Sequence, residues 1–274
     1  MTTEHSREGV LSGGADSVEL RPAATVMLVR EGAGHGTEGI EVYLLRRVPS
    51  MPFAPGAYVF PGGGVDERDA DHEIRWAGPA PAEWAARLGT AEPLARALVC
   101  AAVRETFEES GVLLAGASGS DVVADTRGDD WEADRKALID HSLSFADFLD
   151  QRGLVLRSDL LRAWSRWITP RGEPRRYDTR FFAAVLPEGQ QTRDVGGEAD
   201  RVEWVSPAGA VARWERGELT MLPPTVSSCK ELAACGSLSE VMAAEREIAP
   251  VTPELRVVDG ETRAVFPGGV EYRL

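Results

Sequence analysis

The sequence predicts an α/β fold, an α/β/α sandwich with a mixed central sheet and extra helices. Short runs rich in Val, Tyr and Phe, bounded by glycine or proline, predict strands along the chain. Segments with apolar residues at helical spacing lie between them, and residues 93–110 form the longest. This order of strands and helices suits a sheet that is covered by helices on both faces.

The N-terminal part begins with a polar stretch and continues into two strands. Residues 1–20 contain Gly and Ser among polar residues, so we expect a disordered lead-in before one domain over residues 21–274. Strands are expected at residues 23–30 and 40–46. The glycine-rich loop between them, residues 32–37, lacks the lysine of a P-loop, and no helix pattern follows it.

The rest of the chain continues with further strands and helices. Strands are expected at residues 57–59, 165–169, 179–186 and 202–205. Helices are expected at residues 82–88, 93–110, 207–216, 225–234 and 238–247, and across most of residues 131–163. Gly111 is expected to end the long helix as a C′ glycine. A closing hairpin is expected at residues 255–258 and 263–266, bridged by Asp259-Gly260.

Composition limits the partners that we expect. The formal charge of −14 disfavours non-specific nucleic-acid binding, because phosphates would be repelled over the whole surface. No apolar run reaches the length of a membrane span and no signal region is apparent, so we expect no membrane association. Cys100, Cys229 and Cys235 form no C-x-x-C pair, and reduced thiols in a cytoplasm fit them best.

The segment Arg104-Glu105-Thr106-Phe107-Glu108-Glu109-Ser110-Gly111 is the most informative one. Its three glutamates stand at i, i+3 and i+4, within an arc of roughly 100° on one helix face. Like charges at this spacing cost a few tenths of a kcal/mol per pair, so we expect a compensating positive charge. Arg104 supplies part of that charge, and a divalent cation could supply the rest. Mg²⁺ or Mn²⁺ suits such a site, because both ions favour all-oxygen ligands. The alternative to a metal site is an acidic helix face that is simply solvated.

A second motif, Phe60-Pro61-Gly62-Gly63-Gly64-Val65-Asp66, lies upstream. Together the two segments resemble the Nudix box, G-x5-E-x7-R-E-U-x-E-E-x-G-U, where U is bulky and apolar. Gly63 would open the box, and Val112 fills its last apolar position. Asp69 stands where the first glutamate belongs, and 34 residues separate it from Arg104 in place of seven. Glu92 is the alternative for that acid.

An insertion inside the box, about residues 66–92, is itself a marker within the family. The chain is similar to the Nudix branch that includes a mammalian peroxisomal coenzyme A diphosphatase. The resemblance covers roughly residues 21–270 and includes these further motifs: Thr169-Pro170, Arg175-Arg176-Tyr177-Asp178-Thr179-Arg180-Phe181-Phe182 and Met221-Leu222-Pro223-Pro224-Thr225. The C-terminal Tyr-Arg-Leu differs from the S-K-L peroxisomal signal, so that compartment is not carried over. We expect the insertion to cap the pocket.

The resemblance implies a Mg²⁺- or Mn²⁺-dependent hydrolase that cleaves the diphosphate bond of a nucleoside diphosphate linked to another moiety. Coenzyme A or an acyl-CoA is the most specific substrate that it suggests. ADP-ribose, NADH and dinucleoside polyphosphates stay open as substrates. The sequence gives no oligomeric state, and a homodimer is suggested only because Nudix enzymes often dimerise. Two other hypotheses remain: a non-catalytic Nudix-fold ligand sensor, and a metal-binding protein with little turnover because the first half of the box is altered.

The resemblance also assigns roles to individual residues. Glu105, Glu108 and Glu109 are the expected metal ligands, and the main-chain oxygen of Gly62 joins them. The general base is a box glutamate, Glu105 or Glu108, or else Glu198 on the loop at residues 194–200. Arg104 is expected either to orient the carboxylates through ion pairs or simply to offset their repulsion.

Further arginines are candidates for binding substrate phosphates. Arg175 and Arg176 lie in the densest basic stretch, residues 171–180, just before a strand, and Arg47 ends another strand. A turn whose arginines merely face water is an equally good interpretation of the first two. Trp164, Trp167 and Trp204 are expected in the core, although such rings can stack on a base.

Overall fold

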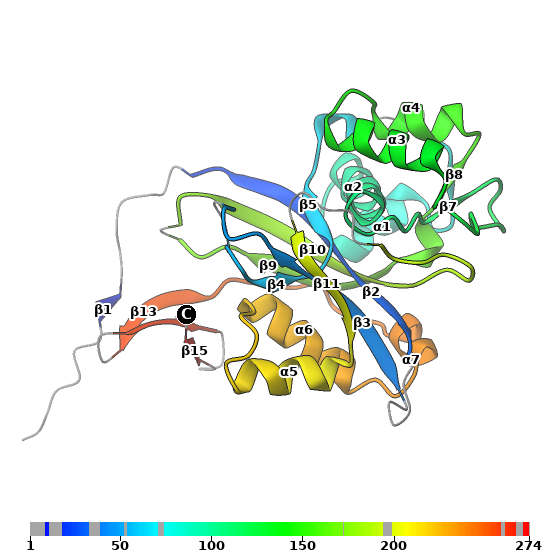
Figure 1. Cartoon of the computed structure of the whole chain (residues 1–274). Helices are drawn as coiled ribbons and strands as arrows, with labels where there is room; N and C mark the ends of the chain where they lie inside the picture. The colour runs from blue at the N-terminus through cyan, green and yellow to red at the C-terminus, as the bar shows by residue number, and fades with distance from the viewer. Residues whose placement is uncertain are drawn as a thin grey trace, which may run out of the picture.

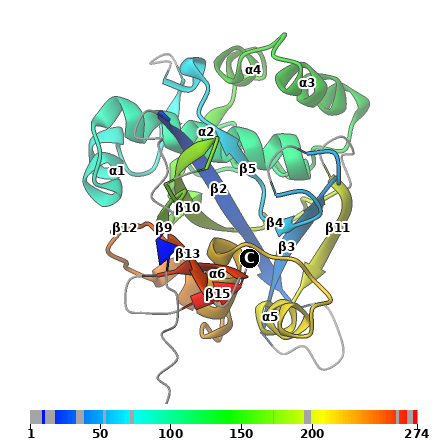
Figure 2. The same ribbon diagram turned by 90° about the vertical axis from the view of Figure 1, so that its left-hand side faces the viewer.

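The structure is a computed structural model that describes residues 9–10, 18–32, 39–51, 54–70, 74–171, 173–193, 199–258, 261–266 and 271–273. Its centre is a mixed sheet in the order β11-β3-β2-β10-β9-β12, with β4 paired to β3 and β5 paired to β2 (Figures 1 and 2). Strands β2 and β10, and β9 and β12, run parallel, while the other neighbours are antiparallel. These strands are β2 (Leu20–Glu31), β3 (Ile40–Arg47), β4 (Tyr58–Val59), β5 (Gly62–Gly64), β9 (Arg162–Ile168), β10 (Arg176–Val185), β11 (Ala199–Val205) and β12 (Pro250–Val251).

Helices cover both faces of this sheet, which confirms the predicted α/β/α sandwich (Figures 1 and 2). One face carries α1 (Pro81–Leu88), α2 (Glu92–Ser110), α3 (Asp129–Ile139) and α4 (Phe145–Gln151). The other face carries α5 (Pro207–Glu215), α6 (Pro223–Ala233) and α7 (Leu238–Ala243). Two separate apolar clusters fill the layers, one on each side of the sheet.

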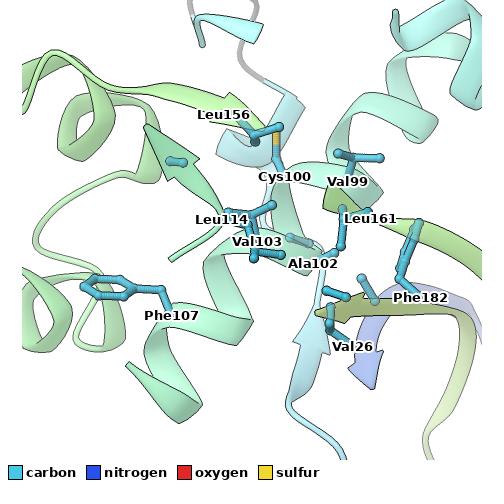
Figure 3. Close-up of a cluster of buried hydrophobic side chains, with 14 of the residues drawn as sticks. Val26, Val99, Cys100, Ala102, Val103, Phe107, Leu114, Leu156, Leu161 and Phe182 are labelled. Atoms are coloured by element: carbon cyan, nitrogen blue, oxygen red, sulfur yellow. The ribbon is translucent and has the colours of Figure 1, made fainter. Parts of the chain in front are cut away.

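The cluster beneath α2 is the larger one. Side chains of β2 and β10, such as Val26 and Phe182, meet Val99 and Ala102 of α2 there (Figure 3). All four side chains are fully buried, so the burial of their whole apolar surface stabilises the fold. This packing fixes α2 on the sheet and thereby sets where its polar residues lie.

Strand β2 has two different neighbours along one edge. Residues 23–25 pair with β5, whereas residues 29–31 pair with β3. Between the two, the Val26 amide donates to the Pro61 carbonyl at 2.8 Å. The divergence of β3 and β5 therefore holds the glycine segment of the box beside the first half of β2.

The long helix has the ends that its sequence predicts. Pro93 lies in the first turn, where a missing N–H costs nothing. Gly111 follows the last turn in the left-handed conformation with φ 74°, and its amide bonds to the Phe107 carbonyl at 2.9 Å. The prediction of a helix over residues 93–110 is thus confirmed to within one residue.

The prediction of mostly helical structure over residues 131–163 is wrong in its last third. Helices α3 and α4 are present, but β8 (Val155–Arg157), the 3₁₀ turn η2 (Ser158–Leu160) and the start of β9 follow them. Strand β8 pairs with β6 (Trp76–Ala77) and β7 (Ala115–Gly116) in a small separate sheet. These partners are distant in sequence, so local periodicity carries no sign of them.

Other elements differ in their bounds or lie outside the described residues. Helix α7 ends at Ala243, four residues before the predicted end. The predicted hairpin forms as β13 (Glu254–Val258) and β14 (Glu261–Val265), joined by β1 (Gly9–Val10) and β15 (Glu271–Arg273) in one sheet. Its Asp259-Gly260 bridge, most of the loop at residues 32–37 and most of the lead-in at residues 1–20 are outside the described part. Among the helices that are described, none is long and apolar enough to cross a membrane.

Candidate active site

Arg104 is the centre of a buried ion cluster where α2 passes β5. Its Nε and Nη2 donate to the two carboxylate oxygens of Asp69 at 3.0 and 2.9 Å. Its Nη1 donates to Glu105 at 2.8 Å and to Glu108 at 3.3 Å. A further bond from Nη2 reaches the Gly64 carbonyl at 2.9 Å. One guanidinium thus ties three carboxylates and the glycine strand together.

This cluster is nearly closed to solvent, which shifts its proton equilibria. Burial raises the pKa of Glu105 to about 7, although Arg104 opposes the shift. Burial also raises the pKa values of Glu108 and Asp69 above their ordinary range. For Arg104, burial alone would lower the pKa, but the three carboxylates raise it, so this residue stays charged. Three carboxyl groups share the single positive charge of Arg104. When all three are ionised, the cluster therefore carries an excess of negative charge.

The glycines of β5 lie against the same carboxylates. The Gly62 amide donates to Glu109 Oε2 at 2.7 Å. A Cβ atom on Gly63 would lie 2.5 Å from Glu105 Oε1, closer than real Cβ contacts allow. Glycine at position 63 lets the Glu105 carboxylate rest directly on the backbone, whereas a larger residue would displace that carboxylate. The two halves of the box, distant in sequence, are brought together as the resemblance implied.

Asp69 is the acid that completes this arrangement. It lies in the 3₁₀ turn η1 (Glu67–Ala70), is 1% exposed, and accepts the Asp66 amide besides Arg104. Glu92, the alternative considered from the sequence, is the exposed first residue of α2. Twelve residues of helix place it about 18 Å from Arg104 along the axis. Asp69 therefore occupies the place of the first box glutamate despite the insertion.

The insertion itself packs at the other end of α2. The Arg96 guanidinium donates to the Ile74 carbonyl at 2.9 Å and lies over the Trp76 ring at 5.2 Å. Trp84 of α1 meets Phe182 edge to face, with ring centroids 5.9 Å apart. That the insertion caps the pocket stays a prediction.

A second group of residues holds the C-terminal end of α2, and the sequence analysis missed it. The Arg135 guanidinium donates to the Glu108 carbonyl at 2.7 Å and forms two bonds with Glu132 at 2.9 and 2.7 Å. Arg193 lies 3.5 Å from Glu132 and donates to the Thr126 carbonyl at 3.0 Å. A buried arginine bonding a helix-end carbonyl satisfies a group that the helix itself leaves open. The i, i+3 spacing of Glu132 and Arg135 was the available sequence signal.

The arginines that were predicted to bind phosphates lie near strand ends, outside the ion cluster around Arg104. Arg175 is exposed in the turn before β10, and Arg176 donates from Nε to the Thr169 carbonyl at 3.2 Å. Arg47, at the end of β3, is half-buried, and its amide bonds to the Ala57 carbonyl at 3.0 Å. Their roles in substrate binding stay predictions. Glu198, the candidate base on the later loop, lies outside the described residues.

The cluster fits a hard divalent cation in donor type and in charge. Its side-chain donors are carboxylate oxygens, and three carboxylates share one guanidinium. In the described part of the chain, no three His, Cys, Asp or Glu side chains form a group that could hold a metal ion as they stand. Glu105 and Glu108 accept hydrogen bonds from Arg104, and Glu109 accepts one from the Gly62 amide.

The fold and the assembled box define a Nudix hydrolase, and comparisons with known proteins identify the branch. The chain belongs to the family whose model is described as the NUDT19 Nudix domain, which matches residues 76–232. Enzymes of the Nudix family generally use divalent metal ions.

Curated relatives carry the same family name. The chain is 30% identical to the acyl-coenzyme A diphosphatase NUDT19 of Homo sapiens, over 74% of this chain and 63% of that protein. It is 28% identical to the protein of the same name from Gallus gallus, over 81% of this chain and 70% of that one. The match to the human protein thus spans less than two thirds of its length.

A solved structure supports the fold. A Nudix hydrolase from Alicyclobacillus acidocaldarius matches with a TM-score of 0.70 and 28% sequence identity, over 85% of this chain and 100% of that one. Together, the family model and the curated relatives confirm the resemblance to the Nudix branch of the coenzyme A diphosphatase.

Proposed function

We propose that this chain hydrolyses the diphosphate bond of coenzyme A or an acyl-CoA. The products would be a nucleoside monophosphate-type fragment and the phosphate of the other moiety. The observation that carries the proposal is the buried cluster in which Asp69, Glu105 and Glu108 share Arg104 beneath the glycine strand. The relationship to proteins named acyl-coenzyme A diphosphatase supports the choice of substrate.

Glu105, Glu108, Glu109 and the main-chain oxygen of Gly62 are the groups that would hold Mg²⁺ or Mn²⁺. When bound, such an ion neutralises diphosphate oxygens and lowers the pKa of a water molecule. Diphosphates are otherwise inert because their anionic oxygens repel an incoming nucleophile. The acidic cluster by itself would repel the substrate, so the same charge excess that attracts a cation makes the cation necessary.

The protein's own groups supply orientation and proton transfer. Arg104 fixes the carboxylates of Glu105 and Glu108 relative to β5, which suits a positioning role. A glutamate would accept the proton of the attacking water, and Glu105, Glu108 and Glu198 are the candidates. Arg47, Arg175 and Arg176 remain proposed contacts for substrate phosphates. We also propose a cytoplasmic location, in agreement with the three free cysteines. A homodimer is a further proposal.

The test is a substrate panel with the purified chain. Coenzyme A, an acyl-CoA, ADP-ribose, NADH and diadenosine polyphosphates are each incubated with Mg²⁺ or Mn²⁺, and products are separated by chromatography. We expect the highest kcat/KM for coenzyme A or the acyl-CoA. Preferred cleavage of another member would reassign the substrate. No turnover of any member would favour the ligand-sensor hypothesis.

A further inference from the structure

A second charged cluster lies on β9 and β10, away from the box. Arg166 donates from Nε and Nη2 to the two Asp178 oxygens at 2.9 and 2.8 Å. Arg180 Nη1 lies 2.5 Å from Asp178 Oδ1. Two guanidinium groups therefore share one carboxylate, so the cluster carries one positive charge in excess. That excess stands out in a chain whose formal charge is −14.

Arg180 is the unusual member, because it is only 1% exposed and its Nε has no hydrogen-bond acceptor among the described residues. Its Nη1 contacts the Asp178 carboxylate at 2.5 Å, and this ion pair opposes the effect of burial on the pKa of Arg180. Burial nevertheless lowers the pKa of Arg180 below its ordinary value. A buried donor without an acceptor lowers the stability of the fold. An anion with several oxygens would supply both the acceptors and the missing charge.

The strand register places this cluster on the same face of the sheet as the box. Arg180 pairs with Ala24 of β2, and Ala24 pairs on its other side with Gly63 of β5. Side chains paired across neighbouring strands share a face, and Ala24 belongs to the apolar cluster beneath α2. Arg180 thus stands two strands from Gly63, about 10 Å, and Arg166 stands one strand further.

We propose that Arg166 and Arg180 form a subsite that binds a phosphate group of the substrate, an inference that rests on the proposed function. Asp178 holds the two guanidinium groups side by side, which suits the forked geometry of phosphate recognition. Arg166 has a side-chain exposure of 21%, so it gives the cluster its side open to solvent. The phosphate has two sources, the cleaved diphosphate itself or a second phosphate elsewhere on the nucleotide.

This subsite differs from the one expected from the sequence. Arg175 and Arg176 were the candidates within the basic stretch, but Arg175 is exposed and Arg176 donates to the Thr169 carbonyl. Arg180, four residues later in the same stretch, is the buried guanidinium with a donor to spare. Strand alternation places Arg176, Asp178 and Arg180 on one face, so Arg176 lies at the margin of the same row.

The experiment measures kcat and KM for Arg166→Met and Arg180→Met with coenzyme A and with coenzyme A that lacks its 3′-phosphate. Loss of one charge-assisted contact should raise KM about 10- to 100-fold, while kcat changes much less. Arg166→Lys keeps the positive charge but loses the forked guanidinium, so its KM should lie between those of the wild type and Arg166→Met. Arg30→Met is the matched control, since Arg30 of β2 is an ordinary arginine paired with Glu41 at 2.8 Å, and its KM should be unchanged.

The two substrates separate the sources of the phosphate. An equal rise in KM for both would assign the subsite to the diphosphate, whereas a rise for intact coenzyme A alone would assign it to the second phosphate. Unchanged KM values for both substrates in Arg166→Met would overturn the subsite. Circular dichroism reports whether Arg180→Met folds, and Arg166→Met, at the more exposed position, carries the test if it does not.

A direct binding measurement separates this proposal from the enzyme assignment. If the wild-type chain hydrolyses neither substrate, the proposed function fails, and calorimetric titration with inorganic pyrophosphate still tests the subsite. Weaker pyrophosphate binding in Arg166→Met than in Arg30→Met would support an anion site. Equal binding in the two variants would contradict it.

Discussion

The two ion clusters on the α2 face of the sheet have opposite compositions. At the box, three carboxylates share Arg104, whereas on β9 and β10 two arginines share Asp178. Both clusters are largely buried, so neither imbalance is relieved by water as it would be at the surface. The protein therefore keeps a negative excess and a positive excess on one sheet face, beside strands β5 and β10, which are two strand spacings or about 10 Å apart.

Such a separation suits a ligand that is itself divided in charge. A divalent cation with a nucleoside diphosphate presents positive charge at one point and anionic oxygens beyond it. A stabilising role alone would favour balanced pairs, since an uncompensated buried charge lowers stability. The two clusters are therefore better explained by binding than by folding.

The largest expected effect comes from the negative cluster. Glu108→Gln and Glu109→Gln each remove a charge without changing size, so hydrolysis should fall by about two to four orders of magnitude while the fold stays intact. Steady-state rates and circular dichroism measure the two quantities. Glu92→Gln, at the exposed start of the same helix, is the control and should keep the wild-type rate. Wild-type rates in both box variants would remove the mechanism.

Removing the shared arginine should unfold the cluster rather than merely slow the reaction. Arg104 has a side-chain exposure of 8% and Asp69 of 1%, so Arg104→Met leaves carboxylates buried without a partner. We expect a loss of about 3–5 kcal/mol in the free energy of unfolding, measured with urea. A loss below about 1 kcal/mol would mean that the cluster relaxes into solvent.

Two neighbouring glycines test how closely the strand and the helix must approach. In Gly63→Ala the new methyl would meet the Glu105 carboxylate, while in Gly64→Ala it would meet nothing within 4 Å. Because the Glu105 carboxylate ends a flexible chain, Gly63→Ala should displace it with little loss of stability. We expect activity to drop about tenfold or more in Gly63→Ala alone. Equal activities of the two variants would show that the placement of Glu105 is not critical.

The smallest expected effect concerns Glu132 and Arg135, the ion pair that holds the C-terminal end of α2. The two hydrogen bonds from Arg135 lower the pKa of Glu132 from 4.5 to about 2. The unfolded chain therefore takes up this proton first, and the stabilisation, complete above about pH 4.5, is lost as the pH falls towards 2. Glu132→Gln should flatten this part of the unfolding free energy against pH. A slope identical to that of the wild type would exclude Glu132 as its source.

Much of this arrangement could be predicted from the sequence because its signals are local. The spacing of Glu105, Glu108 and Glu109 placed them on one helix face, and Gly111 marked where the helix ends. Proline and glycine near its two ends act through their own backbone geometry, so no tertiary information was needed.

The parts that were missed depend on contacts between distant segments. Strand β8 was taken for helix because its partners β6 and β7 lie far away in the sequence. Arg180 became a candidate only when the register set it beside Ala24, which pairs with Gly63 on its other side. Likewise, the insertion made Asp69 ambiguous until its two bonds to Arg104 were seen.

The most direct test of the opposed clusters is an anomalous difference map from a crystal soaked with Mn²⁺ and coenzyme A. The account predicts a manganese peak beside Glu105, Glu108 and Glu109, with phosphate density extending across the sheet face towards Arg166 and Arg180. A map with no manganese peak at the box glutamates, or with those side chains turned into bulk solvent, would contradict it.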